Sequence, residues 1–199
     1  MTIVILVVLS SSTSSSLYSV AAQTNSTWAT FNDSETGISF QYPSDWHTAS
    51  QEYLNMMFRS DLGSDSNSSS IQDMESNVNP IAMILPESLS GSAFFILSEL
   101  LPFNLPIDRY FELTKENIML DPTANVSDPI PVAVGDLNGL KYNITSNTGS
   151  GTVQTQMMFV NDSKGYIVAS QVGNADQVKE SQDLDSIIAT LKFNGSATK

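Results

Sequence analysis

The stretch between residues 131 and 172 constrains the fold most, because it holds strand patterns separated by short turns. Its apolar residues alternate with polar ones or run together, which predicts strands at 131–137, 140–146, 152–160 and 166–172. Asn138-Gly139 is typical of a two-residue type I′ turn, and the segments NTGSG and NDSKG occupy the next two gaps. The sequence therefore predicts an antiparallel meander here.

Two helices are predicted outside the meander, at 105–120 and 176–191. Pro106 suits the first turn of the earlier helix, and Pro122 follows its end. Residues at helical spacing form one face of that helix: Ile107, Tyr110, Phe111, Thr114 and Ile118. The corresponding face of the later helix consists of Leu184, Ile187, Ile188 and Leu191.

Shorter apolar patterns predict strands in the first half of the chain, at 27–31, 38–42, 51–59, 80–85 and 92–100. The resulting order is strands, a helix, the meander and a helix. This order predicts an α+β fold, an α/β/α sandwich in which helices pack on a central antiparallel sheet. The 199 residues are enough for a single domain with a substantial core.

Charge and composition exclude several kinds of site. The net charge of -13 disfavours binding to nucleic acid and strong binding to anionic membranes. The chain has no cysteine and one histidine, His47, so disulfides, thiolate metal sites and multi-histidine metal sites are excluded within one chain. One methionine of each of the pairs 56–57 and 157–158 is expected to face the core, so packing is the expected role rather than copper binding.

The N-terminus is typical of an exported protein. An apolar run, TIVILVVL, precedes a Ser/Thr-rich stretch and small residues that end at Ala22, which predicts a signal peptide at 1–22. The mature protein would then be secreted as one domain, 23–199, unless the uncleaved apolar segment holds it at the membrane. Seven glycosylation sequons agree with export, and their asparagines are Asn25, Asn32, Asn67, Asn125, Asn143, Asn161 and Asn194.

A polar, acidic segment between residues 60 and 79 is predicted to be an exposed loop. Oxygen ligands at short spacing are the ones that calcium prefers, and the candidates in this loop are Asp61, Asp65, Asp73 and Glu75. The segment is not an EF-hand, because serine replaces the required glycine and the last acidic ligand. A solvated loop and a weak cation site are therefore both open.

Asp45 and His47 are the remaining candidates for chemistry. A hydrolase would need an activated serine beside this histidine, and the chain lacks a G-x-S-x-G elbow. We expect His47 to be a surface residue, with an extracytoplasmic hydrolase as the alternative.

Five segments in order resemble the PsbP-like family, named after the extrinsic subunit P of photosystem II. They are GISFQYPSDW, MMFRS, LPIDRYFELTKENI, GDLNGLKYNIT and DSIIATLKF, within residues 28–194. The first segment is the most specific, with Gly37, Tyr42, Pro43 and Trp46. The chain looks most similar to secreted archaeal members of the family.

The resemblance implies the α/β/α sandwich and a binding or assembly role without catalysis. We therefore expect a secreted PsbP-like accessory domain that binds a protein or a small ligand at the cell surface. A calcium-binding accessory protein that uses the loop 61–75 is the alternative. No cofactor other than calcium is indicated.

Overall fold

A computed structural model describes residues 27–60, 78–88, 90–146, 153–173 and 178–193, without the side chains of 57–60. Within these residues the strands form two antiparallel sheets. The large sheet has the order β3-β4-β5-β10-β9-β8-β6, and β7 also pairs with β8. Its strands are β3 (Trp46–Thr48), β4 (Val78–Pro86), β5 (Ala93–Leu100), β6 (Ala124–Val126), β7 (Ile130–Val134), β8 (Leu137–Ser146), β9 (Val153–Asn161) and β10 (Lys164–Val172).

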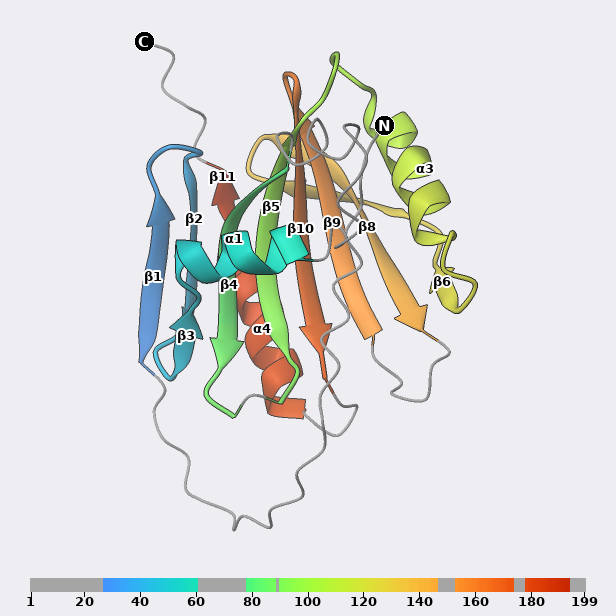
Figure 1. Ribbon diagram of the computed structural model, residues 1–199. Helices are drawn as coiled ribbons and strands as arrows, with labels where there is room; N and C mark the ends of the chain where they lie inside the picture. Colours follow the sequence, from blue (N-terminus) through green and yellow to red (C-terminus); the bar gives the residue numbers. More distant parts are fainter. Residues whose placement is uncertain (1–26, 61–77, 89, 147–152, 174–177, 194–199) are drawn as a thin grey trace.

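The small sheet has the order β1-β2-β11 and stands beside the large one (Figure 1). Its strands are β1 (Trp28–Asp33), β2 (Ile38–Pro43) and β11 (Lys192–Phe193). Because β11 comes from the end of the described chain and β2 from its start, this sheet joins distant parts of the sequence.

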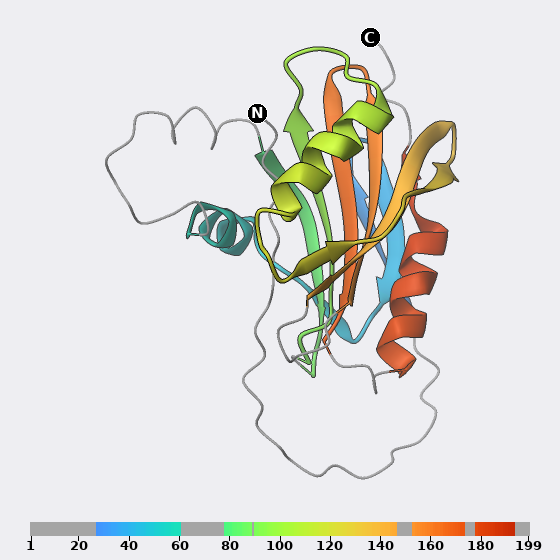
Figure 2. The same ribbon diagram turned by 90° about the vertical axis from the view of Figure 1, so that its right-hand side faces the viewer.

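Helices cover both faces of the large sheet, as the side view shows (Figure 2). One face carries α1 (Gln51–Ser60) and α3 (Ile107–Ile118), and the other carries α4 (Val178–Thr190). The predicted α+β sandwich is therefore confirmed. The buried positions of α3 are the expected Tyr110, Phe111, Thr114 and Ile118, and those of α4 include Leu184 and Ile187.

Two apolar clusters lie on the two faces of the large sheet. The first cluster contains Leu54 of α1 and Tyr110 of α3, and the second contains Leu184 of α4 with Phe40 of the small sheet. The side chains of Met157 and Met158 enter opposite clusters, as neighbours on a strand do. Their packing role is confirmed, and they cannot share one metal ion.

The strand predicted at 51–59 is wrong, because this segment forms α1. The Ser50 hydroxyl accepts a hydrogen bond from the Tyr53 amide at 3.2 Å, which is the arrangement of a helix N-cap. Leu54 is buried against the large sheet. In the sequence, Met57 and Phe58 follow it by three and four residues, which is helical spacing. The apolar spacing in this segment is therefore helical.

The turn predicted at Asn138-Gly139 is also wrong. The chain turns at Gly135 and Asp136, where Val134 pairs with Leu137 and Gly135 has a φ of 59°. Gly139 lies inside β8, and a Cβ atom there would stand 2.2 Å from the Met158 carbonyl oxygen. Glycine is needed at this position for space, and the Asn138-Gly139 dipeptide makes no turn.

The segment GISFQYPSDW forms the strand predicted at 38–42 and then passes from the small sheet to the large one. Gly37, with a φ of 73°, ends the turn from β1, and β2 ends at Pro43. Trp46 begins β3 and is buried in the same cluster as Phe40. The proline thus ends one sheet, and the tryptophan begins the other.

Candidate functional site

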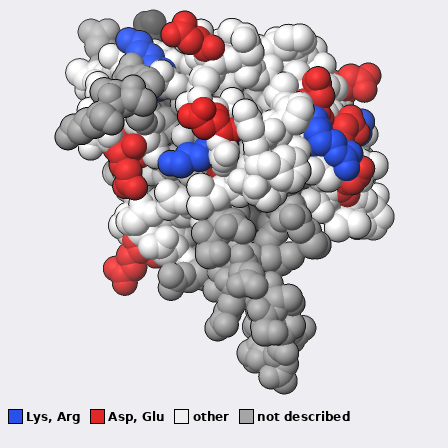
Figure 3. Space-filling model, turned by 90° about the horizontal axis from the view of Figure 1, so that it is seen from above, with Lys and Arg blue, Asp and Glu red and all other residues white. Residues whose placement is uncertain are grey.

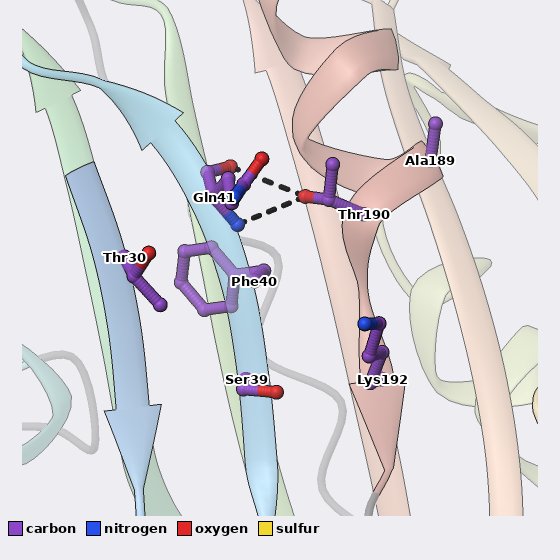
Figure 4. A pocket seen from close by; sticks show the side chains of 7 residues that line it. All are labelled: Thr30, Ser39, Phe40, Gln41, Ala189, Thr190 and Lys192. Atoms are coloured by element: carbon purple, nitrogen blue, oxygen red, sulfur yellow. Dashed lines mark hydrogen bonds between the residues drawn. The ribbon is translucent and has the colours of Figure 1, made fainter. Parts of the chain in front are cut away.

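A groove on the outer side of the small sheet is the candidate binding site. It encloses about 320 Å³ between β1, β2, β11 and the C-terminal end of α4 (Figure 4). It is lined by Thr30, Ser39, Phe40, Gln41, Ala189, Thr190 and Lys192. This volume lies at the lower end of the range of about 300–1,000 Å³ that is typical of small-molecule sites.

The alternation of β2 decides which side chains face the groove. Ile38 and Phe40 are buried toward the large sheet, so Ser39 and Gln41 point to the opposite side. The register places Thr30 of β1 opposite Gln41. It also places Lys192 of β11 opposite Ser39. Neighbouring strands therefore bring their polar side chains into two rows.

Thr190 closes the groove where α4 ends. Its Oγ1 accepts a hydrogen bond from the backbone N–H of Gln41 at 2.9 Å (Figure 4). In a longer sheet, a neighbouring strand would accept this bond. The same hydroxyl lies 2.9 Å from the Ile187 carbonyl oxygen and 3.4 Å from the Gln41 carbonyl oxygen. A hydroxyl has one hydrogen to donate, so Thr190 is expected to donate to the nearer Ile187 carbonyl. The backbone carbonyl of Gln41 can then accept a hydrogen bond from another group.

The lining combines neutral polar groups and the apolar Phe40 and Ala189 with one cation, Lys192. Lys192 is exposed and forms no ion pair with the residues that the structure describes. The lining has no histidine and no carboxylate, so it offers hydrogen bonds and one positive charge but no acid–base pair. This chemistry suits binding.

Charge is dispersed over the end of the molecule seen in Figure 3. Most of this face is uncharged, and its basic side chains lie near acidic ones. A basic patch of the kind that binds nucleic acid is not seen on this face.

The candidate calcium ligands lie outside the described residues; they are Asp61, Asp65, Asp73 and Glu75. Within the described ranges, no group of three or more acidic or histidine side chains is placed to hold a metal ion. The cation site in the loop therefore stays a prediction.

Four sequon asparagines fall within the described residues, and all four side chains are exposed: Asn32, Asn125, Asn143 and Asn161. Asn143 accepts a hydrogen bond from the Thr155 hydroxyl at 2.9 Å, so its amide is partly engaged. The sequons at Asn25, Asn67 and Asn194 lie outside the described residues.

Asp45 lies near a basic residue of α4. Its carboxylate lies 3.6 Å from the Lys179 ammonium group, and both side chains are largely exposed. His47 is exposed on β3, as expected for a surface histidine. Exposed ion pairs contribute about 0–1 kcal/mol, so this contact is a minor link between the turn before β3 and α4.

A carboxyl group is buried away from the groove, between β5, β10 and α3. Glu99 is 6% exposed and lies opposite Gly165, where a Cβ atom would meet the Tyr110 hydroxyl at 2.6 Å. Among the described residues, neither Glu99 Oε1 nor the Tyr110 hydroxyl has a hydrogen-bond partner of good geometry. Burial raises the pKa of Glu99, and the nearby Tyr110 hydroxyl opposes that rise.

We expect Glu99→Gln to raise the midpoint of thermal unfolding at about pH 8 and to change it little at about pH 4. A carboxyl whose pKa rises on folding contributes full stability below its ordinary pKa of 4.5 and loses it as the pH climbs toward the raised value. Glutamine keeps the shape without the charge. Melting curves across this range measure the effect, with exposed Glu112→Gln as the control. A difference that does not depend on pH would contradict the assignment.

None of the helices among the described residues combines the length and hydropathy needed to cross a bilayer. No protein-family model and no curated protein sequence matches the chain. Solved structures do match. Cyanobacterial PsbP from Synechocystis sp. PCC 6803 aligns over 89% of this chain and 98% of its own, with 9% identity and a TM-score of 0.53. The fold is PsbP-like.

A second solved structure shares this PsbP-like architecture. LpqN, described as involved in cell envelope biogenesis of Mycobacterium tuberculosis, aligns over 85% of this chain and 91% of its own. The identity is 10% and the TM-score is 0.52. At such low identities the similarity shows the fold alone.

The sequence pattern does not mark the groove residues as functional. Thr30, Ser39 and Gln41 appear in the sequence only as the polar half of two alternating strands. Thr190 and Lys192 lie about 150 residues further on, and only the pairing of β11 with β2 brings them close. The alternating polar pattern of β1 and β2 is common to most half-buried strands. It therefore does not identify a binding site.

Proposed function

We propose that the chain is a secreted, non-enzymatic accessory domain that binds a ligand at the cell surface through the groove. The mature protein would be the single domain 23–199, after removal of the signal peptide 1–22. The groove carries this proposal, because it is hollow, is lined in part by hydrogen-bonding side chains and is built from both ends of the described chain. The predicted signal peptide and the sequons support a partner at the cell surface.

A binding role agrees with the chemistry of the groove and with the PsbP-like fold. A hydrolase that uses His47 is less well supported, because the nearby Asp45 lies beside Lys179. The two similar structures are named cyanobacterial PsbP and LpqN, and LpqN is described as involved in cell envelope biogenesis. Neither name describes a catalytic activity.

We expect Lys192→Glu to weaken binding of the full chain to surface material from the producing cell by roughly tenfold, because a charged hydrogen-bond donor is replaced by an acceptor. Lys164→Glu makes the same charge change at an exposed position outside the groove. Sedimentation of the labelled proteins with washed envelopes measures the bound fraction. Equal losses in the two variants, or no binding by the unmodified chain, would overturn the proposal.

The calcium alternative predicts a different result. If the loop 61–75 binds calcium, millimolar calcium raises the unfolding midpoint, because a ligand of the native state stabilises it. The rise should disappear when Asp61, Asp65 and Asp73 are all replaced by alanine. Magnesium is the control for the ion. The Lys192→Glu variant, whose loop 61–75 is unaltered, is the control for a change in charge elsewhere. No shift with calcium removes this alternative and leaves the groove proposal standing.

A further inference from the structure

The outer face of the small sheet extends beyond the groove to an exposed tryptophan. Trp28 begins β1, and the strand alternates so that Trp28, Thr30 and Asn32 are exposed. Phe31 lies on the other side, where its ring stacks on Phe40 at 4.8 Å. The Trp28 side chain is 38% exposed, although tryptophan is usually more buried.

Cross-strand pairing arranges this face in three rows. Trp28 lies opposite Pro43, and Thr30 lies opposite Gln41, whose other neighbour is Thr190. In the third row, Ser39 lies between Asn32 and Lys192. An apolar ring thus stands directly beside rows of hydroxyl, amide and ammonium groups.

These groups match one class of ligand. A hydroxyl both donates and accepts hydrogen bonds, and an amide does the same through its two ends. The apolar face of a sugar ring packs on an indole ring, while its hydroxyls need such donors and acceptors. An apolar ligand would cover the exposed Lys192 ammonium group without pairing it, which is costly. A polyanion would meet one cation on a protein with a net charge of -13.

We propose that this face binds a neutral surface polysaccharide, with Trp28 stacking on one hexose ring and the groove residues binding hydroxyls of the neighbouring units. The Trp28 and Lys192 rows are four residues apart along β1, about 13 Å, so more than one sugar unit is needed to span them. This inference rests on the proposed binding role of the groove and names its ligand class. Lys192 donates to a hydroxyl oxygen, and the Gln41 carbonyl accepts from another hydroxyl.

Affinity electrophoresis of the full chain in gels that contain a neutral polysaccharide tests this proposal. The gels hold hydroxyethyl cellulose, mannan or dextran, and polygalacturonate is the acidic comparison. All proteins carry Ser34→Ala, which removes the sequon at Asn32 and keeps a glycan of the chain itself out of the groove. We expect retardation by at least one neutral polysaccharide and a roughly tenfold weaker effect in Trp28→Ala.

Tyr53→Ala is the matched control, because Tyr53 is a similarly exposed aromatic residue, at 40%, on α1. No retardation by the three neutral polysaccharides, retardation by polygalacturonate alone, or equal losses in Trp28→Ala and Tyr53→Ala would each overturn the inference. Envelope binding that still depends on Lys192 would then leave the broader proposal intact. If neither the Lys192-dependent envelope binding nor the retardation by a neutral polysaccharide is observed, both the proposed function and this inference are overturned.

Discussion

Replacing Phe40 by alanine is expected to lower the free energy of unfolding by about 3–5 kcal/mol. Phe40 is 2% exposed and joins the two sheets. Its ring stacks on Phe31 of β1 at 4.8 Å and meets the edge of Phe94 of β5 at 5.0 Å. Alanine removes both contacts and leaves a cavity between the sheets, and the groove above β2 loses its support.

Chemical denaturation of the full chain measures this loss, and Phe103→Ala is the control. Phe103 is 60% exposed, so its replacement should change the free energy of unfolding by less than about 0.5 kcal/mol. Phe40→Leu should fall between the two, because leucine fills part of the space. A Phe40→Ala protein as stable as Phe103→Ala would show that this ring does not hold the small sheet in place.

Gly139→Ala is expected to lower the free energy of unfolding by about 1–3 kcal/mol, because the added carbon overpacks the sheet. A Cβ atom at this position would stand 2.2 Å from the Met158 carbonyl oxygen and 2.6 Å from the Phe159 ring. The carbonyl belongs to β9, which is paired with β8, so it cannot move away without breaking the ladder. Thermal and chemical unfolding both measure the change.

Gly135→Asn separates this lack of space from the need for an unusual backbone angle. Gly135 has a φ of 59°, and nothing lies within 4 Å of a Cβ atom built on it. Asparagine tolerates this conformation better than most residues, so the variant should lose less stability than Gly139→Ala. The reverse order would contradict the placement of the turn at 135–136.

Local spacing was sufficient for the two helices whose apolar faces are long. Tyr110, Phe111 and Ile118 are buried as their spacing predicts, because a helix turns one face to the core whatever that core contains. The segment 51–59 is shorter, and its apolar residues satisfy a strand or a helix nearly as well. The cap at Ser50 and the sheet surface under Leu54 decide in favour of the helix.

The buried polar groups depended on which elements pack together. Gln154 and Gln156 lie on the same face of β9 as Met158, and the Tyr142 hydroxyl donates to Gln156 Oε1 at 2.6 Å. Burial raises the pKa of Tyr142, so it stays neutral and can donate this bond. An alternating pattern shows which residues share a face of a strand. It does not show which of the two faces another element buries.

The sequence by itself determined the α+β class, the antiparallel meander and most helix positions, because these depend on residues close together in the chain. The tertiary structure alone decided that Lys192 lies opposite Ser39 and that Thr190 bonds to Gln41. These contacts join residues about 150 positions apart, and no local pattern specifies them. The groove forms because the end of α4 and the start of β11 both pair with the same edge of β2.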